Sequence, residues 1–187
     1  MTHREVRLSY PVWVFTAVDF DRMYETRDER MVLALVLARE NVERGWGGPF
    51  GAAVFESASG RLVSIGINSV LRMGNSLWHA EVMAIALAHT RVGSHTLGAP
   101  GMVEHELVTS CEPCAMCLGA TLWSGVRSLV CGATRADAES LGFDEGPVTD
   151  ASYAHLESRG IAVARGVQRD RARSIFEAYR ASGGPVY

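Results

Sequence analysis

The sequence lacks the features that mark several large classes of protein. Its 187 residues include 18 basic and 21 acidic side chains, a net charge of -3, and no long basic block of the kind that nucleic-acid binders carry. No apolar run reaches the length of a membrane-spanning helix, and four cysteines are too few for a disulfide framework. These absences favour a cytoplasmic protein that acts on small neutral molecules and uses neither nucleic acid nor membrane as a partner.

The composition fits one domain with a substantial core. Apolar residues make up 48% of the chain and charged residues 21%, an ordinary globular balance. The apolar stretch "VWVFTAV" at 12–18 is short and has neither a basic lead nor a cleavage site. We therefore expect it to pack against the core and not to act as a secretion signal.

Strands and helices are expected to alternate after an opening helix and hairpin, which favours an α/β layered domain. We expect an N-terminal extension at 1–27, one domain at 28–182 and a C-terminal tail at 183–187. The hydrophobic patterns predict helices at 28–45, 79–92, 113–124, 138–143 and 170–182, and strands at 52–57, 61–70, 105–110, 128–133 and 160–167.

Three of the four cysteines fall within seven residues, at Cys111, Cys114 and Cys117. A catalytic zinc takes three nitrogen or sulfur ligands and keeps its fourth position open. Cys114 and Cys117 begin one predicted helix and His79 begins another, where the positive end of each helix favours the thiolate. A redox pair or half of a closed structural zinc site remain alternatives for the C-x-x-C pair alone.

Glu81 follows His79 by two residues, and Pro-Cys-Ala-Met-Cys follows about thirty residues later. This pair of motifs matches the sequence signature of zinc nucleobase deaminases. From about residue 28 to its end, the sequence resembles the cytidine-deaminase-like superfamily. The resemblance implies a three-layer α/β/α fold with a central mixed five-stranded sheet. It also implies Zn²⁺ held by His79, Cys114 and Cys117, with Glu81 as the proton carrier beside the metal.

The remaining two cysteines are expected to be structural. Cys111 precedes the helix and would be the fourth ligand of a closed zinc site, but a small buried residue under the site is the simpler interpretation. Cys131 lies in an apolar strand and is expected in the core.

Further motifs resemble the guanine deaminase branch: "GGPFGAAVF" at 47–55, "GINSV" at 66–70 and "LGFDEGP" at 141–147. The last is the most discriminating, because it is unrelated to the metal. The resemblance implies that Glu145 is a second catalytic acid, which holds the substrate amine or relays protons to it. Asp144 is expected to be a turn or capping residue.

The same resemblance implies four substrate-binding positions. Asn68 would hydrogen-bond the edge of the base, and the backbone N–H of Ala80 would donate to the substrate. Phe50 would stack on the base, and Trp123 would form a wall of the pocket, although core packing is the alternative for both aromatic residues.

The tail "GGPVY" resembles the C-terminal segment that guanine deaminases of this fold exchange between subunits. By that resemblance, Gly183 and Gly184 would form a hinge and Tyr187 would cover an active site, as part of a domain-swapped homodimer. A tail without fixed structure is the alternative.

The sequence thus predicts a zinc-dependent hydrolytic deaminase of a small nucleobase, which converts guanine to xanthine and ammonia and also accepts s-triazines such as ammeline. The alternatives are a tRNA adenosine deaminase, a cytosine or nucleoside deaminase of the same superfamily, or a zinc-stabilised domain without activity. Glu81 argues against the last. Trp78, where relatives often carry a small residue, and the extension at 1–27 are departures that bear on substrate preference.

Overall fold

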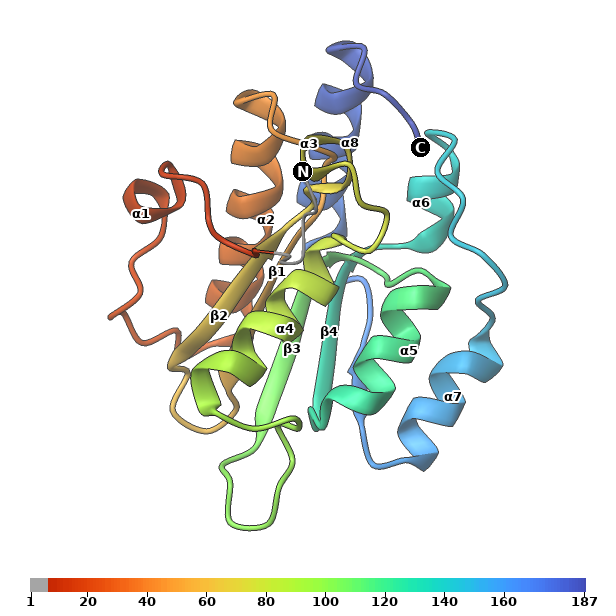
Figure 1. The fold of residues 1–187 in the computed structure, drawn as a ribbon. Coiled ribbons are helices and arrows are strands. Elements are labelled where there is room, and N and C mark those ends of the chain that lie inside the picture. The colour runs from red at the N-terminus through yellow and green to blue at the C-terminus, as the bar shows by residue number, and fades with distance from the viewer. Residues whose placement is uncertain (1–6) are drawn as a thin grey trace, which may run out of the picture.

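The computed structural model describes residues 7–187, which form a five-stranded sheet between two layers of helices (Figure 1). The strand order is β2-β1-β3-β4-β5, in which β1 pairs antiparallel with β2 and β3, whereas β3, β4 and β5 run parallel. This confirms the predicted mixed sheet and layered fold. The strands are β1 (Gly51–Glu56), β2 (Leu62–Ile67), β3 (His105–Cys111), β4 (Ser128–Ala133) and β5 (Ala162–Ala164).

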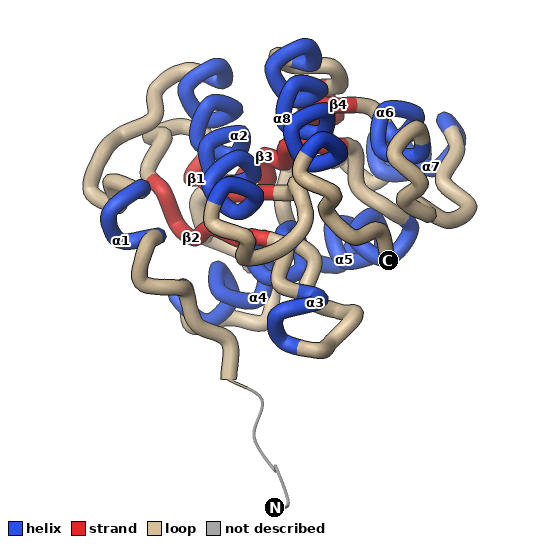
Figure 2. The backbone as a smooth tube through the Cα atoms, turned by 90° about the horizontal axis from the view of Figure 1, so that it is seen from above, coloured by secondary structure: helices blue, strands red, loops and turns tan. Residues whose placement is uncertain are grey.

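Helices cover both faces of this sheet. Helices α2 and α8 pack on one face, and α4 and α5 lie side by side on the other, as the view from above shows (Figure 2). None of the described helices is long and apolar enough to cross a bilayer. The helices are α1 (Val14–Ala17), α2 (Arg27–Glu43), α3 (Val70–Met73), α4 (Ala80–Val92), α5 (Ala115–Ser124), α6 (Arg135–Glu139), α7 (Asp150–Ser158) and α8 (Arg169–Ala181).

Local sequence signals fix where the main helices begin and end. Helix α2 starts with a capping box, in which the side chains of Thr26 and Glu29 each accept a hydrogen bond from the other's backbone N–H. Helices α4 and α5 both end in a glycine with positive φ, Gly93 at 66° and Gly125 at 89°.

A glycine in β2 allows the first turn of α4 to lie directly on the sheet. A Cβ atom at Gly66 would collide with the backbone of Ala80 and Ala84 in α4. Only a residue without a side chain permits so close an approach. Gly66 therefore sets the height of the α4 N-terminus above the sheet, where His79 and Glu81 lie.

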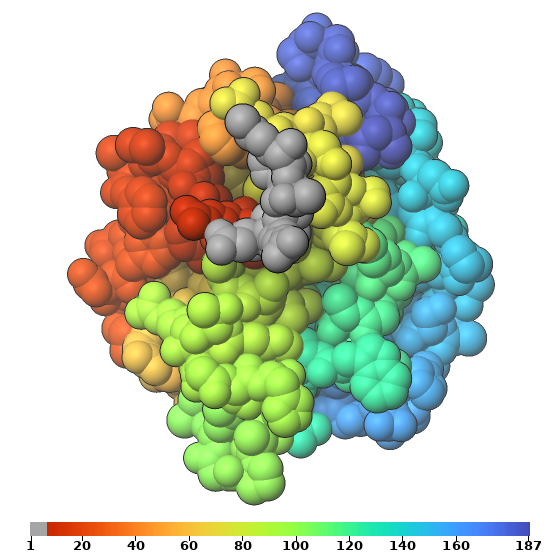
Figure 3. Space-filling view, viewed as in Figure 1, coloured from red at the N-terminus to blue at the C-terminus, as the bar shows by residue number. Residues whose placement is uncertain are grey.

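The predicted N-terminal extension packs closely on the domain. Residues 7–26 run along the β2 edge and beside α2, the red region of Figure 3. Trp13 and Val14 are buried in the core, as expected for the 12–18 stretch, and the Tyr10 hydroxyl accepts a hydrogen bond from the Ile65 N–H on β2. This segment thus covers an edge strand that would otherwise expose unpaired backbone groups.

Several predicted boundaries differ from the observed ones. The short helix expected at 138–143 is α6 at Arg135–Glu139, because Thr134 and Asp137 form a capping box that starts it earlier. Helix α5 begins at Ala115 with Cys114 as its N-cap, so that Pro113 lies outside the helix. The strand expected at 160–167 is only three residues long, and α7 was not predicted.

Candidate active site

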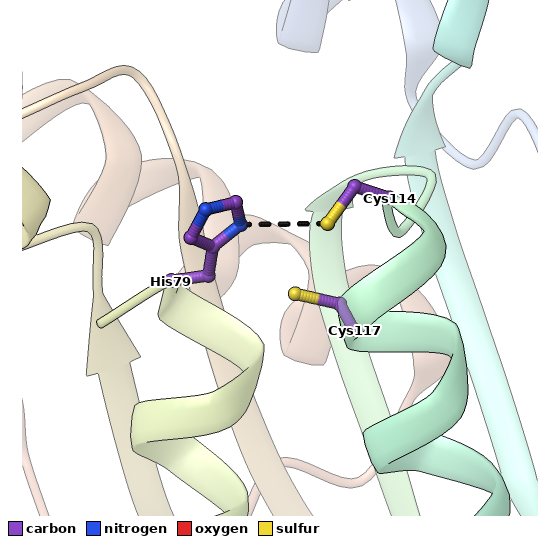
Figure 4. A group of neighbouring side chains, drawn as sticks. All are labelled: His79, Cys114 and Cys117. Carbon is purple, nitrogen blue, oxygen red and sulfur yellow. Dashed lines mark hydrogen bonds between the residues drawn. The ribbon is translucent and has the colours of Figure 1, made fainter. Parts of the chain in front are cut away.

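Two helix N-termini bring the predicted metal ligands together. His79 is the N-cap of α4, Cys114 is the N-cap of α5, and Cys117 lies one turn further along α5. Because α4 and α5 lie side by side, the imidazole and the two thiols point toward one another (Figure 4). The ligand atoms all lie within 4.8 Å of one another, and His79 Nδ1 is 3.5 Å from Cys114 Sγ.

These three side chains fit a zinc ion. Zinc binds sulfur at about 2.3 Å and nitrogen at about 2.0 Å, so two ligands on a tetrahedral ion are about 3.5–4 Å apart. The 3.5 Å between His79 Nδ1 and Cys114 Sγ matches this spacing, and all three ligand atoms lie close enough together to bind one ion. Three ligands leave one tetrahedral position for a reactant, which is the pattern of catalytic zinc sites.

The surroundings favour the thiolate that a metal requires. The Cys117 thiol donates to the Cys114 sulfur, and this hydrogen bond, together with that from His79, lowers the pKa of Cys114 to about 4 despite burial. The same bond, with burial, raises the pKa of Cys117 in the metal-free protein. Cys114 therefore carries a negative charge at neutral pH before any metal binds, which favours capture of a cation.

The other cysteines lie outside the ligand cluster, as expected. Cys111 is buried, and its Sγ is 3.6 Å from the carbonyl oxygen of Thr134. Cys131 is fully buried in β4.

A small cavity lined by two of the ligands, His79 and Cys114, lies at the edge of the sheet where β3 and β4 end. Its volume is about 30 Å³, room for about two water molecules, so a flat ring can enter only when part of the wall moves. The lining combines carboxyl, amide, aromatic and metal-ligand side chains. The residues are Phe50, Asn68, His79, Glu81, Glu112, Cys114, Phe143, Asp144, Glu145 and Tyr187.

Both predicted catalytic acids line this cavity. Glu81 lies in the first turn of α4 and is 6% exposed, and burial followed by the nearby Cys114 charge raises its pKa. Glu145 is 7% exposed, and burial together with the charges of Cys114 and Glu81 raises its pKa to about 8. The pKa of Glu145 thus lies near neutrality, where a carboxyl can both accept and return a proton, as general acid–base chemistry requires.

A tight turn holds Glu145 against the metal-ligand helix. The Glu145 carbonyl accepts a hydrogen bond of 3.0 Å from the N–H of Ala115 in α5. Asp144 accepts one of 2.9 Å from the N–H of Gly146, whose φ is 69°. Asp144 therefore has the turn role predicted for it, and it also contributes to the cavity wall.

The predicted substrate-binding residues divide into two groups. Asn68 and Phe50 line the cavity, where Asn68 is buried and the Phe50 ring packs 5.0 Å from that of Phe143. Ala80 is the first residue of α4, so its N–H has no acceptor within the helix. Trp123 is 76% exposed and does not line the cavity. Its predicted role as a pocket wall is wrong for this chain, because it lies on the outer face of α5.

The tail folds back over the cavity of its own chain. The Tyr187 hydroxyl donates a hydrogen bond of 2.5 Å to Asn68 Oδ1, and its ring lies edge-on to Phe143 at 5.7 Å. Pro185 is tied down as well, because its carbonyl accepts 2.7 Å from the Tyr179 hydroxyl. In this chain the tail therefore lies against the cavity of the same subunit, and its exchange between subunits stays a prediction.

Sequence reasoning missed two lining residues, Phe143 and Glu112. Phe143 belongs to the same "LGFDEGP" stretch as Glu145, so its position in that motif was an available signal. Glu112 stands between Cys111 and Pro113 and carries no signal of its own without the fold.

The family model that matches this chain is the cytidine and deoxycytidylate deaminase zinc-binding region, over residues 24–133. The matched segment contains the three ligands and Glu81, which the structure brings together. The chain therefore belongs to this family of zinc-binding deaminases. It is a zinc-dependent hydrolase of the aminohydrolase type.

Comparisons with individual proteins point to one branch of the family. The chain is 40% identical to a guanine deaminase of Bacillus subtilis over 60% of this chain and 67% of the relative. A solved guanine deaminase from Nitrosomonas europaea has 42% identity and a TM-score of 0.91 over 97% of this chain and 99% of that one. A solved complex with 2,6-diaminopurine gives 44% identity and a TM-score of 0.91 over 97% and 95% of the two chains.

Similarity to deaminases that act on tRNA is weaker. A tRNA-specific adenosine deaminase of Buchnera aphidicola is 27% identical over 68% of this chain and 77% of its own length.

Proposed function

We propose that this enzyme deaminates a free purine base and converts guanine to xanthine and ammonia. The observation that carries the proposal is that Glu81, Glu145 and Asn68 line one small cavity together with two members of the metal-ligand triad. The likeness to guanine deaminases over nearly the whole chain supports the choice of base. A cavity closed by Tyr187 favours a free base over a nucleoside, because a sugar would have to pass through the cover.

The reaction exchanges an amino group for oxygen. Water adds its oxygen to C2 of guanine, the C2–N bond breaks, and the amino group departs as ammonia. Zinc, when bound, makes water acidic enough to supply the attacking oxygen. Glu81 takes the proton released from that water and delivers it to the ring nitrogen beside C2. Burial raises the pKa of the Glu81 carboxyl, so that it holds the proton between the two transfers.

The remaining cavity residues orient the base. The side-chain amide of Asn68 pairs with the polar edge of the purine, and a base without that edge leaves a buried amide unpaired. Glu145 faces the departing amino group and accepts its hydrogen bonds or passes it a proton. Phe50 covers one face of the ring, with Phe143 behind it.

A homodimer is part of the proposal, with purine metabolism in the cytoplasm as its setting. In such a dimer the tail can open at Gly183, the residue of positive φ after α8, and close over the partner's cavity. Mixing Glu81→Gln subunits with subunits lacking 183–187 tests the exchange. Activity in the mixture requires exchange, because only the shortened subunit with its partner's tail is complete, whereas an inactive mixture means that each tail serves its own subunit.

The central experiment measures ammonia release across a panel of guanine, guanosine, ammeline, cytosine, adenine, cytidine and tRNA. We expect turnover of guanine, slower turnover of ammeline and none of guanosine or tRNA. Release from tRNA without release from guanine would replace the proposal by the tRNA adenosine alternative. Release from cytosine or cytidine alone would move the enzyme to that branch.

Two variants test the assigned roles. Glu81→Gln should keep zinc and fold but lose about a thousandfold in kcat, as loss of an acid–base residue does. Cys114→Ser should lower the zinc content measured by elemental analysis, and chelation of wild-type enzyme should abolish turnover that added zinc restores. Full activity of Glu81→Gln in a zinc-loaded sample would remove the proton-carrier role.

A further inference from the structure

One carboxylate in the cavity wall has no part in the chemistry above. Glu112 lies two residues before Cys114 in the loop that joins β3 to α5, and it is only 3% exposed. A buried carboxylate is costly unless it is paired. Its partners therefore indicate what it does.

The two oxygens of Glu112 bind two different loops. Oε1 accepts a hydrogen bond of 2.6 Å from Nε of Arg165, in the loop after β5. Oε2 accepts one of 2.8 Å from the backbone N–H of Arg135, the first residue of α6 after β4. Glu112 itself follows β3, so one side chain connects the segments that leave all three parallel strands.

Backbone hydrogen bonds support this edge unevenly. The Glu112 N–H donates to the Ala133 carbonyl of β4 at 2.8 Å, whereas the loop after β5 has a single such bond to β4, from the Val167 N–H to the Cys131 carbonyl at 2.9 Å. The β4–β5 ladder ends at the Val130–Ala164 pair, and β5 has only three residues. Beyond that pair, the Glu112 carboxylate is the described link between the Cys114 loop and the Arg165 loop. The Cys114 loop carries a metal ligand, and Ala115 in the next position holds Glu145.

Arg165 also balances charge. Glu81, Glu112 and Glu145 line one small cavity with the Cys114 sulfur, and negative charges that share such a site oppose one another. The Arg165 guanidinium places a positive charge directly on Glu112. The guanidinium also donates a hydrogen bond of 2.9 Å to Asp150 Oδ1. Its central carbon lies 4.4 Å from the centre of the Tyr153 ring, in a cation–π contact.

We propose that Glu112 and Arg165 form a positioning pair that holds the metal-ligand loop of Figure 4 and the Glu145 turn in their working geometry. The pair touches no reacting atom and acts through Cys114 and Glu145. The expected effect of the pair on metal retention depends only on the assignment of the three ligands. Its expected effect on turnover rests on the proposed function. Partners behind metal ligands typically change metal affinity by about 10–100-fold when they are removed.

The test compares Arg165→Met with Arg169→Met. Arg169 is a matched control, because it too donates two hydrogen bonds to carboxylate oxygens, of 2.8 and 2.9 Å and both to Asp137, and has a similar side-chain exposure of 46% against 40%. Asp137 does not line the cavity. Zinc release to a chelator, kcat and KM for guanine, and the unfolding midpoint are measured for each variant.

Arg165→Met should release zinc about 10-fold faster or more, and its kcat should fall about 10-fold with KM within about twofold. Arg169→Met should change only the unfolding midpoint. Arg165→Lys, which keeps the charge but offers one donor group, should recover most of the zinc retention. Glu112→Gln and the double variant should each match Arg165→Met, because two residues that act as one unit do not add.

Zinc release from Arg165→Met at the Arg169→Met rate would overturn the proposal. So would a double variant, Glu112→Gln with Arg165→Met, whose zinc release is faster by the product of the two single effects. The outcome does not depend on the substrate. If the wild type releases no ammonia from guanine, the proposed substrate fails, and the zinc-release comparison still decides the role of the pair.

Discussion

The two ends of the chain lie on the same domain but make contacts of opposite kinds. The segment 7–26 buries Trp13, Val14 and Val18 in the core and covers the β2 edge. The tail 183–187 leaves Tyr187 38% exposed and Val186 45% exposed, and its best-defined contact is a hydrogen bond to Asn68 in the cavity.

This difference separates stability from catalysis. Apolar burial stabilises the folded state roughly in proportion to area, so the N-terminal segment is expected to be part of the folding unit. The tail buries little and rests on a polar group of the active site, so it is free to open at a small cost in free energy. Changes at one end should therefore alter unfolding, and changes at the other should alter turnover.

The largest expected effect comes from Trp13→Ala. Removing a buried indole should lower the free energy of unfolding by about 3 kcal/mol, with kcat on guanine unchanged at temperatures where the variant is folded. Denaturant unfolding together with steady-state kinetics checks this. Val12→Ala, at a neighbouring side chain that is 83% exposed, is the control and should leave both quantities unchanged.

Deleting residues 183–187 should have the reverse profile. Without the cover, water enters the cavity and the base is held less firmly, so kcat should fall about 100-fold, or about 2.7 kcal/mol in the barrier. The unfolding midpoint should stay within about 2 °C of the wild type. An unchanged rate would show that the tail is not a lid and would remove the contrast between the two ends.

Gly48→Ala tests the closed position without altering the tail. A Cβ atom at Gly48 would collide with the Tyr187 hydroxyl, while its other nearest neighbours, in Asn68 and Phe50, lie at an ordinary 3.4 Å. Closure should therefore be hindered, and kcat/KM should fall about 10-fold, or about 1.4 kcal/mol. Gly119→Ala, in α5 with no atom near the added methyl group, is the control and should keep full activity.

Tyr187→Phe should have the smallest effect. The ring keeps its contact with Phe143 but loses the hydrogen bond to Asn68, a net contribution of about 1 kcal/mol. A fall in kcat/KM of about fivefold corresponds to that energy. A fall as large as that of the deletion would mean that the hydroxyl has a direct part in the chemistry.

The metal ligands and Glu81 were accessible to prediction because they stand in two short motifs that carry the family resemblance. His79 and Glu81 are two residues apart at the start of one helix, and Cys114 and Cys117 are one turn apart at the start of another. The position of Trp123 around its helix could also have excluded it from the pocket wall. It lies six residues after Cys117, about 240° further around α5, and so faces away from the site.

Other features carried too weak a local pattern. Helix α7 buries only Tyr153 and Leu156 among its nine residues, which gives little apolar periodicity. The position of α6 depends on a capping box that overrides the apolar pattern. The covering role of residues 7–26 depends on which strand lies at the sheet edge, and strand order is not a local property.

The sequence by itself determined the α/β class and the ligand types, because these follow from the order of the predicted elements, from spacing within single helices and from the chemistry of zinc. Only the tertiary structure decided that α4 and α5 place their N-termini together, that the Tyr187 hydroxyl meets Asn68, and that Glu112 connects three loops. Such contacts join residues up to 119 positions apart, as Asn68 and Tyr187 are, and no local pattern encodes a meeting over that distance.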